Sequence, residues 1–412
     1  MELFDPCLSF QDHTLIKASG LYPYFRTLDG SEGPVATIAG ARKVMMGSNN
    51  YLGLTHHPEV QRAAHEAIDR YGTSCTGSRL LNGNIDLHET LERELAEHTG
   101  KESALVFASG FLANLGSIGL LTAPKGCTVF SARENHASLI EGTRAGRGRV
   151  LIYDDLDQLE RLLGERPQWR DALLVTDAVF SMTGRVADLE RIAALRRRFG
   201  FRVYIDDAHG LGVLGERGAG TAAAAGVTDE VDLIFGTFSK ALASMGGFVA
   251  GDRAVIDYLR HKARTLIFSA ALTPPATASA LAALRVMRTE PGLFERLWEN
   301  VALFRDGIEA LGYFTMGSRT PIIPLFIGSE SLAFRVCKEV LDAGVFTTPV
   351  VYPAVPLGQA LIRTSIMPTH RREHLEQALA VFAEIARRHP IPMELTAETL
   401  PHAEAMDFSY LR

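Results

Sequence analysis

Short apolar runs alternate with amphipathic stretches through the middle of the chain. Seven runs have the length and the apolar content of buried strands. They are residues 103–107, 128–130, 150–153, 172–176, 203–205, 233–235 and 247–250. Stretches with helical spacing lie between them, for example 156–163 and 189–199. Strands that alternate with helices predict an α/β large domain built on a mostly parallel, seven-stranded sheet.

The pattern changes near residue 285, where a helical stretch over 275–288 leads into a second unit. Helices and strands follow in a less regular order there, which predicts a small α+β domain. Its expected helices are 293–311, 331–343 and 370–388, and its expected strands are 322–327 and 361–365. We therefore expect an N-terminal arm (1–48), a large domain (49–285), a small C-terminal domain (286–390) and a tail (391–412).

The arm contains an aromatic segment interrupted by proline, Tyr22-Pro23-Tyr24-Phe25, and a predicted hairpin over 36–46. Such an arm packs either on its own domain or on a partner subunit, and the sequence leaves both arrangements open. Pro390 lies just before the tail and Pro392 within it, among mixed polar residues, so we expect the tail to be partly disordered.

Composition and charge narrow the class of protein. The 412 residues are 47% hydrophobic and 22% charged, with a formal net charge of −6, as in an ordinary globular enzyme. No basic tract predicts a nucleic-acid partner. The four cysteines show no disulfide framework or zinc spacing, so we expect no metal. The sequence shows no signal-peptide pattern and no apolar run of about 18 residues, so we expect a cytoplasmic protein. Peripheral contact with a membrane stays open.

A lysine follows one of the predicted strands and marks the first candidate site. Residues 231–235 lead directly into Gly236-Thr237-Phe238-Ser239-Lys240. An amine near hydroxyls and backbone N–H groups suits a Schiff base beside a bound phosphate, although such a lysine can also be a solvated loop residue.

An acidic segment lies one strand–helix–strand unit before Lys240. There the strand 203–205 ends at Asp206-Asp207-Ala208-His209. Parallel strands present their carboxyl ends at one edge of the sheet, so these groups should meet Lys240. A carboxylate at Asp206 can pair with a protonated pyridine nitrogen, and this pair predicts a pyridoxal phosphate site. In the alternative, Asp206 caps the next element and His209 only packs.

Three further segments carry candidate chemistry. Gly110 and Phe111 open a helix after the first strand and suit a phosphate, unless the glycine serves only a tight turn. His136 opens the next helix, where it could lie over a cofactor ring or act as a cap. Arg363 lies inside an apolar strand and needs an anion, either a substrate carboxylate or a structural partner.

One motif points elsewhere. Residues 210–215 match G-x-G-x-x-G directly after a strand. A dinucleotide site needs this turn to open a helix, and the segment 216–220 is a poor helix start. We interpret the motif as a glycine loop beside the site.

Together these residues resemble the α-oxoamine synthases, a family of fold-type-I pyridoxal phosphate enzymes. The resemblance runs from about Tyr22 to about Ala386. It is carried by the segments 236–240, 243–248, 77–83 and 86–88, supported by 22–25 and 321–325. Ser239, directly before the lysine, favours the serine palmitoyltransferase branch of bacteria over relatives that usually have glycine there.

The resemblance implies a role for each candidate residue. Lys240 would hold the cofactor and act as the base at Cα, Asp206 would pair with the ring nitrogen, His136 would stack on the ring, and His209 would contact the ring oxygen or the substrate. The phosphate would bind Gly110, Phe111, Thr237 and Ser239, with Ser269 reaching the phosphate of a partner subunit. Arg363 would bind the amino-acid carboxylate, with Asn50 nearby from the other subunit of a homodimer that shares its active sites.

The implied reaction condenses L-serine with a long-chain acyl-CoA, such as palmitoyl-CoA, to 3-ketodihydrosphingosine, CoA and carbon dioxide. An α-oxoamine synthase that uses alanine or glycine, or a non-catalytic subunit on the same fold, remains an alternative. Two segments depart from the family pattern. Arg185 stands where the family often has an acidic residue, and Asp188 could take over the role of that acid. The segment 347–353 differs from the commonest sequence of the family at this place.

Overall fold

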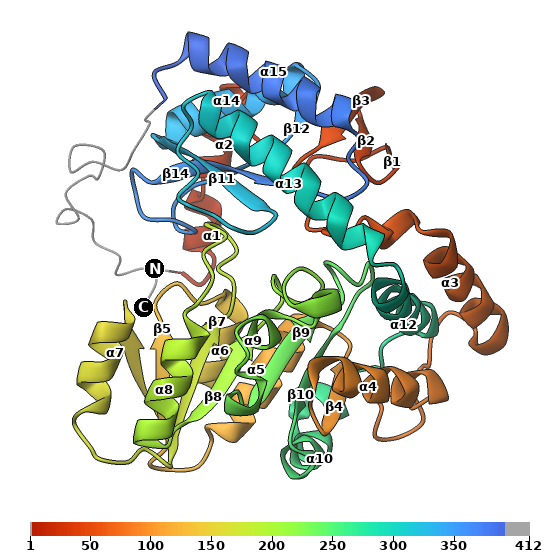
Figure 1. The fold of residues 1–412 in the computed structure, drawn as a ribbon, viewed down its shortest axis with the longest axis vertical. Helices are drawn as coiled ribbons and strands as arrows, with labels where there is room; N and C mark the ends of the chain where they lie inside the picture. The colour runs from red at the N-terminus through yellow and green to blue at the C-terminus, as the bar shows by residue number, and fades with distance from the viewer. Residues whose placement is uncertain (1, 392–412) are drawn as a thin grey trace.

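A computed structural model describes residues 2–391 and shows a large lower unit joined to a smaller upper one (Figure 1). The prediction for the tail therefore concerns residues that lie almost wholly outside the described part.

All seven predicted strands form one sheet. Its strands are β4 (Ser103–Phe107), β5 (Thr128–Ala132), β6 (Arg149–Tyr153), β7 (Ala172–Asp177), β8 (Arg202–Asp206), β9 (Leu233–Thr237) and β10 (Gly247–Gly251), in the order β4-β10-β9-β8-β7-β5-β6. Every neighbouring pair from β6 to β9 is parallel, and β10 runs antiparallel to both β9 and β4. The mostly parallel, seven-stranded sheet is confirmed.

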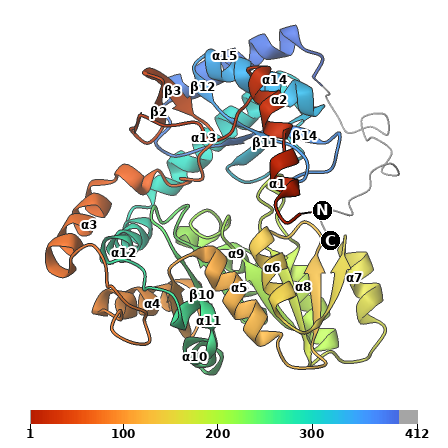
Figure 2. The same cartoon turned by 180° about the vertical axis from the view of Figure 1, so that it is seen from behind.

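Helices cover both faces of this sheet (Figures 1 and 2). One face packs on α7 (Leu156–Leu163), α8 (Leu189–Phe199) and α9 (Thr221–Ala224). The other packs on α5 (Gly110–Leu121), α6 (Ala137–Ala145), α10 (Arg253–Lys262) and α11 (Arg264–Ile267). Successive residues of a strand serve opposite faces, as Val129 and Phe130 of β5 do. Burial on both faces explains the apolar runs of central strands such as β7 and β9, whereas the edge strand β6 is largely exposed.

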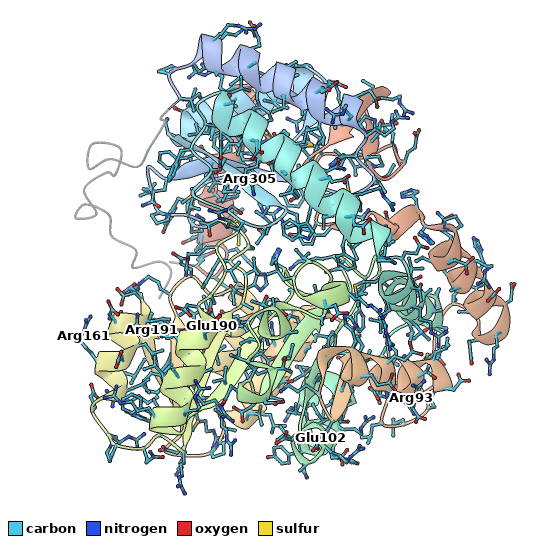
Figure 3. The ribbon with its side chains drawn as sticks, in the orientation of Figure 1. Arg93, Glu102, Arg161, Glu190, Arg191 and Arg305 are labelled. Atoms are coloured by element: carbon cyan, nitrogen blue, oxygen red, sulfur yellow. The ribbon has the colours of Figure 1, made fainter. Side chains whose placement is uncertain are left out.

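Charged side chains lie on the outer surface of this layer (Figure 3). Arg191 of α8 contacts both Asp157 and Glu160 of α7, so the two helices are joined across their solvent side. Exposed pairs of this kind typically contribute less than about 1 kcal/mol each, so the apolar core dominates the stability of the layer.

Besides the apolar cores on the two faces of the sheet, a third apolar core joins the large and small units. It packs α3 (Pro58–Tyr71), α4 (Asp86–Thr99) and the long helix α12 (Pro274–Thr289) against the remaining face of β4 and β10. The same core continues into the small unit. A single continuous core holds the sheet edge and the small unit together, which fixes Arg363 relative to the large domain.

The small unit contains a three-stranded antiparallel sheet, ordered β11 (Ile322–Gly328), β14 (Ala360–Ser365) and β13 (Thr348–Val350). Helices α13 (Gly292–Ala310), α14 (Glu330–Asp342) and α15 (Arg372–Arg388) pack on it. The predicted helices and the two predicted strands of this unit are present. The short strands β13 and β12 (Val345–Phe346) were not predicted.

The N-terminal hairpin packs on the same chain. Its strands β2 (Val35–Ile38) and β3 (Ala41–Met45) follow the short β1 (Gly30–Ser31), and β3 pairs in parallel with β12. Residues 41–45 and 345–346, far apart in the sequence, therefore lie side by side at the top of the molecule (Figure 2). The arm also contains two short helices that the pattern did not predict, α1 (Asp5–Ser9) and α2 (Asp12–Ala18).

Among the described residues, no helix is long and apolar enough to cross a bilayer.

Candidate active site

The candidate site lies at the carboxyl edge of the sheet, where β8 and β9 end. The two strands are parallel neighbours, and Asp206 pairs in register with Phe235. Two residues beyond Phe235, Thr237 ends β9, and Lys240 follows in the turn. The structure thus brings the predicted carboxylate and the predicted lysine to one place, as expected for adjacent parallel strands.

A cavity of about 240 Å³ opens at this edge. It contains eight of the nine residues that the sequence predicts for cofactor binding. They are Gly110, Phe111, His136, Asp206, His209, Thr237, Ser239 and Lys240. The ninth, Ser269, lies just after α11 and does not line the cavity of its own chain. The two predicted substrate residues, Asn50 and Arg363, also lie outside its lining.

A chain of hydrogen bonds connects Lys240 to Arg363. Nζ of Lys240 lies 2.9 Å from Nε2 of His209, and Nδ1 of His209 lies 2.6 Å from the hydroxyl of Tyr51. Arg363 donates to that hydroxyl at 3.0 Å. The guanidinium also donates to the Ser181 carbonyl at 2.7 Å. Arg363 is buried. Its partners here are neutral groups, so its charge has no acidic partner among these contacts.

The hydrogen bonds from Lys240 to Arg363 can form in two patterns of donors and acceptors. A charged Lys240 donates to His209, which donates from Nδ1 to Tyr51, and Tyr51 donates to Asn49 at 3.2 Å. A neutral Lys240 instead accepts from Nε2, while Tyr51 donates to Nδ1. In the second pattern the Tyr51 proton turns from Asn49 to His209, so among these groups Oδ1 of Asn49 loses its donor, and the lysine can lose its proton.

The surroundings of Lys240 favour that loss. Removal from water lowers the pKa of its amine from 10.5 to about 8, although the carboxylates of Asp206 and Asp177 oppose the shift. An amine that is partly neutral at physiological pH is an effective nucleophile for an aldehyde.

Asp206 is buried at the end of β8. Its Oδ2 accepts from Nδ2 of Asn114 at 2.8 Å, and its Oδ1 accepts from the backbone N–H of Ala208 at 3.0 Å. Burial raises the pKa of the carboxyl group, and Lys240, the Ala208 N–H, His136 and the Asn114 amide oppose the rise. Asp206 lines the cavity wall, and a carboxylate there suits a cationic ring nitrogen.

His136 is the N-cap residue of α6, as one sequence alternative proposed, and it also faces the cavity. Its Nδ1 lies 2.7 Å from the Ser138 hydroxyl, and its backbone N–H donates to Asp177 at 2.9 Å. Burial lowers the pKa of the imidazole, so the ring is held neutral. A neutral, flat ring at the cavity wall suits stacking on an aromatic cofactor.

Small and hydroxyl residues form another part of the cavity lining. The helix α5 begins at Gly110, and Ser109 caps it by accepting from the Phe111 N–H at 3.2 Å. The hydroxyls of Thr237 and Ser239 lie 2.9 Å apart beside it. A Cβ at position 110 would lie 3.1 Å from the Phe235 ring and 3.2 Å from the Thr237 hydroxyl, so glycine leaves room for both side chains. A helix start lined with hydroxyls fits a phosphate group.

These observations together fit pyridoxal phosphate. The cavity offers an amine with a lowered pKa, a buried carboxylate, a flat neutral ring and an anion seat at a helix start. Lys240 would hold the aldehyde, Asp206 the ring nitrogen and His136 the ring face. The phosphate would bind at Gly110, Thr237 and Ser239.

Sequence reasoning missed several residues of this site. Tyr51 and Asn114 had no assigned role, although Asn114 is a polar residue inside an apolar helical stretch. Asp177 ends β7 and lines the cavity, and its pKa is raised well above the usual value, first by burial and then by Asp206. The rule that identified Asp206, an acid at the end of a buried strand, would also have found Asp177.

The glycine loop 210–215 forms turns rather than the start of a helix. It folds back over Asp207, which accepts from the backbone N–H of Thr221 at 2.7 Å and from its hydroxyl at 2.5 Å. A Cβ at Gly210 would lie 2.1 Å from the Asp207 carboxylate, so only glycine permits this approach. The loop supports the segment that carries His209.

The Arg185 departure has a local explanation. Arg185 donates to Glu134 at 2.6 Å and lies 3.9 Å from the centre of the Phe180 ring. Asp188 does not compensate for the missing acid, because its carboxylate caps α8 by accepting from the Arg191 N–H at 2.9 Å.

Comparison with known proteins places this geometry in a family. The family model "Aminotransferase class I and II" matches residues 41–382. The chain belongs to this family. Within it, the most similar relatives identify the chain as an α-oxoamine synthase. The serine palmitoyltransferase of Bacteriovorax stolpii is 46% identical over 92% of this chain and 91% of that protein.

A second relative carries a different activity. The 8-amino-7-oxononanoate synthase of Geobacter metallireducens is 44% identical over 90% of this chain and 96% of that protein. Among solved structures, that of serine palmitoyltransferase (SPT) with its pyridoxal phosphate (PLP) internal aldimine has a TM-score of 0.90 and 30% sequence identity to this chain. The match covers 94% of this chain and 99% of that one. The fold of this α-oxoamine synthase is therefore fold type I.

Proposed function

We propose that this α-oxoamine synthase condenses L-serine with a long-chain acyl-CoA, such as palmitoyl-CoA. The products are 3-ketodihydrosphingosine, CoA and carbon dioxide, so the protein would act in sphingolipid synthesis. The observation that carries the proposal is the hydrogen-bonded chain from Lys240 through His209 and Tyr51 to Arg363. It connects an amine that can hold an aldehyde to a guanidinium that can hold a carboxylate, as an amino-acid substrate of a pyridoxal phosphate enzyme requires.

When bound, pyridoxal phosphate supplies an electron sink for the carbon that loses its proton. Asp206 supports that role, because its carboxylate stabilises a proton on the ring nitrogen. Thr237, Ser239 and the start of α5 would hold the phosphate, Asp206 would hold the ring nitrogen and His136 would hold the ring face. Arg363 orients the amino acid by its carboxylate.

Lys240 moves the proton at Cα of the amino acid. Its neutral amine, favoured above about pH 8, would take the proton from Cα of the amino acid and would return a proton after carbon dioxide leaves. His209 lies within hydrogen-bonding reach of this amine and can exchange a proton with it at Nε2.

We further propose a cytoplasmic homodimer with active sites shared between subunits. The family resemblance implies that Asn50 and Ser269 act across the subunit interface, and neither lines the cavity of its own chain. Asn50 is buried, and its Nδ2 donates to Thr55 at 2.8 Å while its Oδ1 has no hydrogen-bond partner. In the proposed dimer, Asn50 and Ser269 complete the site of the partner.

The deciding experiment incubates the purified protein, loaded with pyridoxal phosphate, with L-serine and palmitoyl-CoA. Mass spectrometry should detect 3-ketodihydrosphingosine. Parallel reactions replace serine with glycine or alanine, because the two types of curated relative are 46% and 44% identical to this chain. If only alanine or glycine reacts, the protein is a sister synthase with another substrate.

A non-catalytic subunit on the same fold is the alternative of another class. The retained Lys240, with its pKa lowered to about 8, argues against it, because a scaffold has no use for such an amine. Purified protein without a visible absorbance band in the presence of pyridoxal phosphate would favour the scaffold.

A further inference from the structure

A buried asparagine connects two of the residues proposed to hold the cofactor. Asn114 lies on the second turn of α5 and is 1% exposed. Its Nδ2 donates to Asp206 at 2.8 Å and to the Ser138 hydroxyl at 2.9 Å. Its Oδ1 accepts from the hydroxyl of Tyr204 at 2.7 Å. The amide therefore uses both of its donors and its acceptor inside the protein.

The partners determine which way the amide faces. An ionised Asp206 can only accept, and the Tyr204 hydroxyl faces the other end of the amide as a donor. Turning the amide over would place Oδ1 against the carboxylate and Nδ2 against the tyrosine. The orientation thus follows from the groups around it.

The hydrogen bond between Asn114 and Ser138 also determines which nitrogen of His136 carries the proton. Because Ser138 accepts from Asn114, its own proton is free to donate to Nδ1 of His136 at 2.7 Å. The backbone N–H of Ser138 also donates to Nδ1, at 3.2 Å. Two donors on Nδ1 leave the proton of the neutral imidazole on Nε2.

We propose that Asn114 is a positioning residue that joins Asp206 to His136 and fixes the orientation of both side chains toward the cofactor. One amide thereby orders the group at the ring nitrogen and the group at the ring face. Asn114 itself does not line the cavity, so it acts through its two partners. The inference rests on the proposed function, and it extends it to a residue with no direct contact to the cofactor.

Other charges also face Asp206 and must be considered in any pH experiment. They come from the ends of β7 and β8, the start of α6 and the turn after β9. The groups are Asp177, Tyr204, Asp207, His136 and Lys240. A change at Asn114 adds or removes no charge among these groups, and it alters Tyr204 and His136 only through the hydrogen bonds of the amide, so a shift in titration between variants reports on the amide network.

The test compares Asn114→Ala with the control Asn300→Ala in the holoenzyme. Asn300 also donates twice from its amide, to Met367 at 3.0 Å and His370 at 2.8 Å, but it lies in the small unit. We expect Asn114→Ala to lower kcat at least about tenfold, with KM for the amino acid changed less than about threefold. The pH midpoint of the visible cofactor band should shift by more than about half a unit. Asn300→Ala should change neither.

A second readout does not depend on the reaction. Histidines labelled with ¹⁵N in the full chain report which ring nitrogen carries the proton, and the His136 signal is identified by its loss in His136→Asn. We expect Nδ1 of His136 to be unprotonated in the wild type and to exchange between both forms in Asn114→Ala. Asn114→Ser, which keeps one hydroxyl donor, serves where the alanine variant does not fold.

An unchanged kcat and an unchanged pH midpoint in the Asn114 variants would overturn the inference, as would the same changes in Asn300→Ala. A wild-type His136 protonated at Nδ1 would also overturn it. If the wild type binds no cofactor or makes no product, the proposed function fails, while the histidine spectrum still tests the hydrogen-bond network by itself.

Discussion

Nζ of Lys240 lies 2.9 Å from Nε2 of His209 at the carboxyl edge of the sheet. This contact combines a nucleophile with a proton acceptor in a site removed from bulk water. Burial lowers the pKa of the lysine and, together with the charges of Lys240 and Arg363, holds the pKa of His209 well below its usual value. Near neutral pH His209 is therefore neutral, whereas Lys240 becomes mostly neutral only above about pH 8.

The first prediction concerns the pH dependence of cofactor loading. In cofactor-free protein, the rate of reaction with pyridoxal phosphate should rise with pH through about 8 and then level off, because only the neutral amine of Lys240 attacks the aldehyde. Stopped-flow absorbance between pH 6 and 10 measures it. A rate that keeps rising to the ordinary lysine pKa of about 10.4 would contradict the lowered value.

The second prediction concerns Asp206. Asp206→Asn should lower kcat by at least about a hundredfold, because a neutral amide does not stabilise a proton on the ring nitrogen. Steady-state kinetics with serine and palmitoyl-CoA measure the loss. Asp188→Asn is the control, since that carboxylate caps α8 away from the cavity and the variant should keep wild-type kcat. Equal losses in both variants would show that the effect is structural.

The third prediction concerns Tyr51. Tyr51→Phe removes the hydroxyl that contacts both His209 and Arg363. We expect KM for the amino acid to rise about tenfold, because Arg363 loses a bond that orients its guanidinium, and kcat to fall because His209 loses its partner. KM for palmitoyl-CoA should stay within about threefold. A rise in KM for the acyl-CoA alone would place Tyr51 in a different role.

The fourth prediction concerns stability and pH at Asp207. Burial raises the pKa of its carboxyl group to about 7. The folded state then binds a proton that the unfolded state has already released between pH 4 and 7, so Asp207 lowers the stability progressively as pH rises through this range. Relative to wild type, Asp207→Asn should gain up to about 1.4 kcal/mol per pH unit across it.

Urea denaturation of cofactor-free Asp207→Asn and wild type at pH 5 and pH 7 measures this gain. The difference between the two proteins should move in favour of the variant at the higher pH. A difference that is the same at both values would show that the carboxyl group titrates normally.

The fifth prediction concerns the family departure at Arg185. Its pair with Glu134 is solvent-exposed on both sides, so it should contribute less than about 1 kcal/mol. Arg185→Ala should therefore keep kcat within about threefold and lower the free energy of unfolding only slightly. A tenfold loss of activity would show that the loop after β7 depends on this cation.

The sequence predicts the strands of the large sheet well for a physical reason. Strands β7 and β9 are buried on both faces, so each begins with a continuous apolar run that no surface helix resembles. The antiparallel direction of β10 and the pairing of β3 with β12 depend on contacts between distant segments. Local patterning carries no signal for either.

The site residues also fall into those that local sequence predicts and those that depend on contacts between distant segments. Lys240, Asp206 and His209 follow strands and were predicted because strand ends converge at one edge of a parallel sheet. Asn114 lies inside an apolar helix, and Tyr51 reaches the site from a segment 158 residues before His209. Their roles arise from hydrogen bonds across the fold, which the order of residues along the chain does not reveal.

The central claim is that Lys240 holds the cofactor covalently. Borohydride reduction of protein saturated with pyridoxal phosphate, followed by peptide mapping, tests it most directly. We predict a pyridoxyl label on the peptide that contains Lys240 and its absence in Lys240→Ala. A label on another lysine, or unlabelled Lys240 in saturated protein, would contradict the account.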